Sequence, residues 1–137
     1  MATFIGIDLG TTYSLVSELD DTGRPQIIRD SEGNNLIPSC IEFVDNVAEV
    51  GETARKGLGW NENVLGRFKR DMGTATKYKV GDQEYTPTDC SALILKKLLQ
   101  VAEEKLGKGE VGEAVVTIPA NFTNEARTET LSAAKKA

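Results

Sequence analysis

The residues best suited to chemistry lie in one nonapeptide near the N-terminus, Gly6 to Ser14, which reads GIDLGTTYS. Asp8 ends an apolar run, and Gly10 begins a short turn that Thr11 and Thr12 fill with hydroxyl groups. Glycine lets backbone amides approach a ligand closely, and successive amides in a turn form a concavity suited to phosphate oxygens. A neighbouring carboxylate can hold hydrated Mg2+. The nonapeptide therefore predicts a phosphate site with magnesium.

A bare Asp-x-Gly is usually an ordinary hairpin turn, so Asp8-Leu9-Gly10 alone would not carry this interpretation. The longer pattern differs from the common glycine-rich phosphate loops. No Gly-Lys-Ser/Thr follows, which excludes a Walker loop, and the Gly-x-Gly-x-x-Gly spacing of dinucleotide sites is missing. A phosphate grip built from strand, turn and strand remains.

Composition narrows the classes of function. The chain has 137 residues, of which 39% are hydrophobic and 27% charged, as expected for one soluble domain. A net charge of -5 repels a phosphate backbone, so we expect no nucleic-acid partner. With no histidine and only Cys40 and Cys90, neither a disulfide framework nor the usual zinc site can be built. The longest aliphatic run, Ala92 to Leu95, is far shorter than the roughly 18 residues of a membrane span, so we expect no membrane partner.

The N-terminus argues against a secretory signal. No basic residue precedes the first apolar stretch, and Asp8 lies inside that stretch. We therefore expect a cytoplasmic protein.

Two strands should position the nonapeptide. Apolar residues dominate 3–9 and resume in 13–19, which predicts two strands joined by a tight turn. A turn signal at 20–23 and a third strand at 24–29 would complete a meander. We expect this sheet to form the core.

The middle of the chain predicts smaller elements. Residues 30–38 are polar and predict a loop, followed by short extended pieces at 40–44 and 48–50. Residues 51–71 predict one or two short helices, and 77–86 a small hairpin. These pieces should form a small subdomain beside the main sheet.

A long helix is predicted from residue 86. Thr86 is a suitable N-cap, Pro87 suits the first helical position, and Asp89 adds an acid to the first turn. Apolar residues then recur at spacings of three and four up to Leu106, and Gly107 provides the stop.

The last elements are a strand and a helix. Residues 113–118 predict a strand ended by Pro119, and Thr123 should cap a helix with Glu125 in its first turn. No glycine or proline ends this helix before residue 137, so we expect a longer natural protein.

The nonapeptide closely resembles the first phosphate loop of the seventy-kilodalton heat-shock chaperones, a branch of the actin-like ATPase superfamily. Other segments resemble that family in the same order, and the resemblance runs from residue 4 to the end of the chain. These segments are Asp30–Asn34, Ile37–Ser39, Val50–Ala54, Phe68–Arg70 and Val115–Phe122.

The resemblance implies an α/β, ribonuclease-H-like fold of the actin-like ATPase type, of which the chain would form only the first lobe. We expect a mixed sheet flanked by helices, with an inserted small subdomain. Residues 1–30 and 111–137 would form the main subdomain. Residues from about 31 to 110 would form the inserted subdomain and a connecting helix.

Roles are carried over position by position. Asp8 resembles the acid that contacts magnesium through water, and Lys69 resembles the catalytic lysine. A lysine near the terminal phosphate would stabilise charge that develops in phosphoryl transfer. Without the resemblance, Lys69 would be read as part of a solvated basic turn. The residues that resemble the loop meeting the nucleotide phosphates are Gly10, Thr11, Thr12 and Tyr13.

Two further residues resemble those that link nucleotide state to another domain. Pro119 resembles the proline that couples the two, and Arg127 resembles the arginine that relays the change to the surface. From pattern alone, a proline that ends a strand and a solvated arginine on a helix explain these residues equally well.

The implied function is that of an ATP-binding, ATP-hydrolysing chaperone in protein folding and the stress response, with ATP or ADP and Mg2+ as cofactors. The implied partners are unfolded client peptides, a J-domain co-chaperone and a nucleotide exchange factor. Further parts of the nucleotide site would follow residue 137, so we expect the chain alone to be catalytically incomplete. Alternatives are a small-molecule kinase of the sugar or acetate type, an actin-like filament ATPase, and a structural domain without a ligand.

Overall fold

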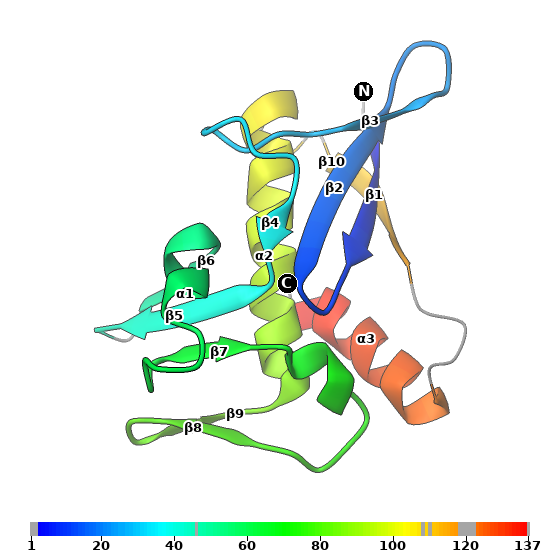
Figure 1. The fold of residues 1–137 in the computed structure, drawn as a ribbon. Coiled ribbons are helices and arrows are strands. Elements are labelled where there is room, and N and C mark those ends of the chain that lie inside the picture. The colour runs from blue at the N-terminus through cyan, green and yellow to red at the C-terminus, as the bar shows by residue number, and fades with distance from the viewer. Residues whose placement is uncertain (1–2, 46, 108, 110, 118–122, 137) are drawn as a thin grey trace.

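The strands predicted around the Gly10 turn form the centre of a mixed sheet in the computed structural model of the chain (Figure 1). Strand β1 (Thr3–Leu9) runs antiparallel to β2 (Tyr13–Leu19), and β2 runs antiparallel to β3 (Pro25–Ile27), which confirms the meander. Strand β10 (Val111–Thr117) lies parallel to β1 on the other side. The residues that the structure describes are 3–45, 47–107, 109, 111–117 and 123–136.

The side chains of β1 alternate between a buried and an open face. Ile5, Ile7 and Leu9 are buried, whereas Phe4 and Asp8 are exposed. This is the two-residue period of a strand with one face on the core. The carboxylate of Asp8 therefore lies on the sheet face opposite the hydrophobic core.

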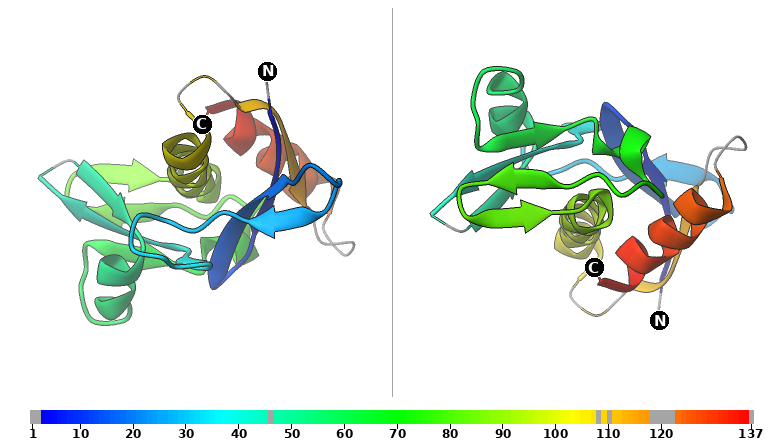
Figure 2. Two further views of the ribbon diagram at one scale, coloured as in Figure 1. Left: turned by 90° about the horizontal axis from the view of Figure 1, so that it is seen from above. Right: turned by 90° about the horizontal axis from the view of Figure 1, so that it is seen from below.

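Helix α2 (Pro87–Leu106) begins where the sequence predicts. The Thr86 hydroxyl accepts a hydrogen bond from the Asp89 amide at 3.0 Å, and the Asp89 carboxylate accepts one from the Thr86 amide at 3.0 Å. This reciprocal capping box satisfies amides that the first helical turn leaves without a partner. Helix α3 (Asn124–Lys136) packs along α2 (Figure 2).

The middle of the chain forms a second sheet with strand order β6-β5-β7 and a separate hairpin. The sheet consists of β5 (Cys40–Val44), β6 (Val47–Val50) and β7 (Val64–Gly66), and the hairpin of β8 (Tyr78–Val80) and β9 (Gln83–Tyr85). The predicted extended pieces and the hairpin are thereby confirmed.

The prediction of helices alone for residues 51–71 is wrong in part. Helix α1 (Glu52–Lys56) and the short 3-10 helix η1 (Phe68–Asp71) are present, but residues 64–66 form β7 between them. Strand β7 is stabilised by pairing with β5, which lies far away in the sequence. Three residues are too few to show a strand period.

The predicted loop 30–38 also contains a strand. Residues 37–38 form β4 (Ile37–Pro38), which pairs with Tyr13 and Ser14 of β2. This pairing fixes the middle segment against the turn that follows β1. No helix among the described residues has both the length and the apolar character to cross a membrane.

Candidate functional site

Asp8 is positioned by the pairing of β1 with β10. Its register partner is Thr117, whose hydroxyl donates a hydrogen bond of 3.1 Å to Asp8 Oδ1. The carboxylate is exposed, so this bond orients it without enclosing it. The sequence did not single out Thr117, because parallel pairing between distant segments leaves no local signal.

Gly10 is required by space rather than by backbone angle. A Cβ atom on this residue would lie 2.1 Å from the carbonyl oxygen of Tyr13, far inside van der Waals contact. No rotation of a side chain relieves a collision with backbone. Only glycine lets the turn between β1 and β2 close this tightly.

Two buried serines hold the turn from behind. The Gly10 amide donates to Ser14 Oγ at 3.2 Å, and the Ser39 hydroxyl donates to the Gly10 carbonyl at 2.9 Å. The two serine oxygens lie 2.8 Å apart. Because the single Ser39 hydroxyl proton is committed to Gly10, Ser14 is the donor in the Ser14–Ser39 bond. The three bonds close a ring around Gly10.

A further bond ties the turn to the same segment. The Ser39 amide donates to the Thr12 carbonyl at 2.9 Å, just after β4 pairs with Tyr13 and Ser14. The sequence analysis noted Ser39 as part of a family landmark but assigned it no role in the site. Its signal is tertiary, because Ser39 lies far from Gly10 along the chain.

The predicted phosphate-binding residues form the accessible tip of this clamped turn. Thr11 is half-buried, and Thr12 and Tyr13 are exposed. Hydroxyl and amide donors beside an acidic side chain suit an anionic ligand that carries a divalent cation. The described residues contain no cluster of three or more His, Cys, Asp or Glu that could hold a metal. Magnesium at Asp8 would therefore keep most of its water ligands.

Lys69 lies on η1 and is buried, with 6% of its surface exposed. Burial lowers the pKa of its ammonium group, and the nearby Asp8 carboxylate opposes that shift. The tertiary structure thus brings Lys69 within electrostatic range of Asp8. A solvated basic turn is the wrong description of Lys69, although its neighbours Arg67 and Arg70 are exposed as that description requires.

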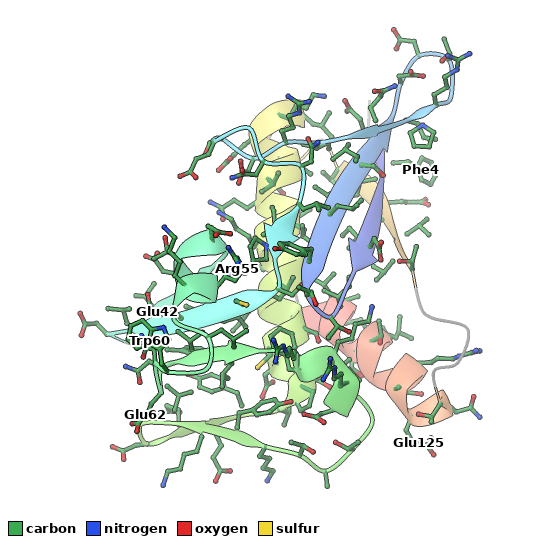
Figure 3. The ribbon with its side chains drawn as sticks, viewed as in Figure 1. Phe4, Glu42, Arg55, Trp60, Glu62 and Glu125 are labelled. Atoms are coloured by element: carbon green, nitrogen blue, oxygen red, sulfur yellow. The ribbon has the colours of Figure 1, made fainter. Side chains whose placement is uncertain are left out.

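A second cation lies near the turn. Arg55 of α1 pairs with Glu52 at 2.5 Å (Figure 3). The hydrogen bond from Glu52 is the main cause that raises the pKa of Arg55, and charges at Tyr13 and Cys40 add to it. Arg55 therefore lies close enough to influence the turn. The sequence analysis quoted the segment that contains it but assigned it no chemistry.

The predicted coupling residues lie at the end of the chain. The cap on α3 is confirmed, because the Ala126 amide donates to Thr123 Oγ1 at 3.1 Å. Arg127 follows in the first turn, with an exposed side chain and its amide bonded to the Thr123 carbonyl at 3.0 Å. Pro119 lies outside the described residues.

Comparisons with known proteins agree with this geometry. The family described as "Hsp70 protein" matches residues 4–80 and 74–137. A curated relative, "Chaperone protein DnaK" of Mycoplasma mobile, is 41% identical over 131 residues, which cover 96% of this chain and 22% of the relative. The chain thus spans about a fifth of the length of that relative.

Proposed function

The chain belongs to the Hsp70 family, and from that premise we propose that it supplies the first phosphate-binding loop of a chaperone ATPase. The family implies an actin-like ATPase fold, and the mixed sheet with its helices is consistent with a first lobe of that fold. Our division into a main subdomain, 1–30 and 111–137, and an inserted one, from about 31 to 110, is part of this proposal.

One observation carries the proposal. The turn after β1 is held in a single shape by the ring of bonds around Gly10, and Asp8 and the buried Lys69 lie beside it. A rigid turn with donors at its tip, flanked by one acid and one cation, is preorganised for phosphate. The cost of arranging these groups is met during folding rather than during binding.

Each residue then has a defined role. Bound ATP with Mg2+ would supply the phosphoryl group that is transferred to water. The tip of the turn, formed by Gly10, Thr11, Thr12 and Tyr13, donates hydrogen bonds to anionic oxygens. Asp8, oriented by Thr117, binds the water shell of magnesium.

Lys69 supplies positive charge where negative charge develops. Its burial matters, because a cation in a site with little water acts on a neighbouring charge more strongly than one in bulk solvent.

The activity of the whole protein is a further part of the proposal. We propose that it hydrolyses ATP and uses the change of nucleotide to act on unfolded client peptides, together with a J-domain co-chaperone and an exchange factor. Pro119 and Arg127 would relay the change between domains. This work would take place in the cytoplasm, in protein folding and the stress response. The 137-residue chain, as about a fifth of a relative's length, would not hydrolyse ATP alone.

The test is steady-state ATP hydrolysis by the whole protein, with and without an extended hydrophobic peptide. We expect peptide to stimulate hydrolysis, and Lys69→Ala to lower the rate at least ~100-fold, in the range found for single electrostatic groups. Lys79→Ala is the matched control, because Lys79 is an exposed lysine of the β8–β9 hairpin. Hydrolysis that ignores peptide or survives Lys69→Ala would refute the assignment.

The alternatives predict other results in the same assay. A small-molecule kinase would consume ATP only when a sugar or carboxylic acid is added. A filament ATPase would hydrolyse ATP as it assembles, which sedimentation would detect. The family match favours the chaperone over both.

A further inference from the structure

The turn that follows Lys69 is in backbone contact with helix α3. A Cβ atom on Gly73 would lie 2.6 Å from the Ala126 amide nitrogen and 3.0 Å from both the Ala126 Cα and the Glu125 carbonyl carbon. Glu125 is labelled at the first turn of α3 in Figure 3. Because all three atoms are backbone, no rotamer change could make room for a side chain.

Both partners in this contact are held in place by other bonds. On the Lys69 side, the Met72 amide bonds to the Lys69 carbonyl at 3.3 Å, and buried Met72 accepts a hydrogen bond from Ser91 of α2 at 3.4 Å. On the α3 side, Ala126 is buried, and its amide bonds to the Thr123 hydroxyl at 3.1 Å. Neither turn can move away from the other without breaking one of these contacts.

The backbone on either side of Lys69 is also constrained. Arg67 has a φ of 57° and Gly73 a φ of 81°, so left-handed residues bracket the turn. A non-glycine residue in this region is uncommon and costs of order 1 kcal/mol or more. A turn fixed at both ends moves as a unit, and Lys69 moves with it.

We propose that Gly73 is a positioning residue through which the first turn of α3 sets the position of Lys69. The contact gives a direct mechanical path from the helix that carries Arg127 to the nucleotide site. A shift of α3 toward Gly73 moves the Lys69 turn, and a gap between them uncouples the two. This inference depends on the proposed role of Lys69 in hydrolysis.

The experiment compares two glycine-to-alanine variants in the whole protein. Gly23 has a φ of 80°, nearly the same as that of Gly73, but a Cβ there meets nothing within 4 Å. Both variants carry the same left-handed strain, and only Gly73→Ala forces backbone apart. The measurements are Mg-ATP affinity, single-turnover hydrolysis and stimulation by a hydrophobic peptide.

We expect Gly73→Ala to lower the hydrolysis rate by roughly 10- to 100-fold, as for a catalytic group displaced by about 1 Å. ATP affinity should stay within about twofold, since the phosphate turn is untouched. Gly23→Ala should match the unchanged protein in all three measurements. A Gly73→Ala protein with normal hydrolysis and normal peptide stimulation would overturn the proposal, as would an equal loss in Gly23→Ala.

A second variant approaches the contact from α3. Thr123→Ala removes the cap on Ala126, leaves Gly73 intact, and keeps the test available if Gly73→Ala does not fold. We expect reduced peptide stimulation with unchanged ATP affinity, and unchanged stimulation would overturn the inference. If the unaltered protein does not hydrolyse ATP, or Lys69→Ala is fully active, it is the proposed function that fails.

Discussion

The hydroxyl of Ser14 lies 2.8 Å from the hydroxyl of Ser39, and this contact joins the strand after the phosphate turn to the middle segment of the chain. Both serines are almost fully buried, and each makes a second hydrogen bond to Gly10. Among the described buried side chains, no nitrogen or oxygen lacks a partner. The turn therefore has its shape before any ligand arrives.

Ser39→Ala should destabilise the chain and loosen the turn. The change leaves the Gly10 carbonyl and the Ser14 hydroxyl without their buried partner, which costs about 1–3 kcal/mol. Urea denaturation measures the loss, and ATP binding by the whole protein should weaken in parallel. Ser17→Ala is the control, because the Ser17 hydroxyl makes only a long 3.5 Å bond to Gly6. Equal losses in the two variants would contradict this reading of the ring.

Gly10→Ala should abolish phosphate binding, whereas Gly6→Ala should be tolerated. The Cβ at Gly10 meets backbone at 2.1 Å, but the Cβ at Gly6 meets only the Ser17 hydroxyl, at 3.0 Å. A side chain can rotate away, and a carbonyl inside a hairpin cannot. Isothermal titration with Mg-ATP on both variants of the whole protein checks this. Normal binding by Gly10→Ala would show that the turn is not the site.

Asp8→Asn should remove the magnesium dependence of ATP binding and leave the fold intact. Asparagine keeps an oxygen that can accept the hydrogen bond from Thr117, but it lacks the charge that attracts hydrated magnesium. ATP affinity measured with magnesium and with chelator should differ in the original protein and converge in the variant. Asp82→Asn, at an exposed acid of the β8–β9 turn, should behave like the original protein.

Asp20 should make stability fall in acid. Hydrogen bonds, first from the Thr22 hydroxyl and then from the Arg24 amide, lower its pKa from 3.8 to about 2. A carboxyl with a depressed pKa adds stability above its ordinary pKa, and that stability is lost as the pH falls toward the lower value. Asp20→Asn should therefore flatten the stability curve between pH 3.8 and about 2. Asp21→Asn, an exposed acid of the same turn, should leave the curve steep.

The two cysteines should react only after unfolding. Burial raises the pKa of Cys90 to about 12 and also raises that of Cys40, so little thiolate forms at neutral pH. Labelling by a thiol reagent should be slow in the native chain and should follow the urea unfolding curve. Rapid labelling without urea would mean that one of these thiols is accessible.

The sequence by itself determined the elements whose signals are local. The apolar alternation of β1 and β2, the capping box at Thr86 and the spacing along α2 are complete within one segment, so each could be predicted. The nonapeptide likewise fixes which donors stand at the turn. Its likeness to a family then supplied the roles that we propose for them.

Only the tertiary structure decided which distant groups meet. Strands β4 and β7 have two and three residues and are stabilised by partners elsewhere in the chain. The ring that joins Ser39 to Gly10, the burial of Lys69 near Asp8, and the contact of Gly73 with α3 arise in the same way. Such contacts depend on the packing of whole elements, and packing is a property of the folded chain rather than of any window of its sequence.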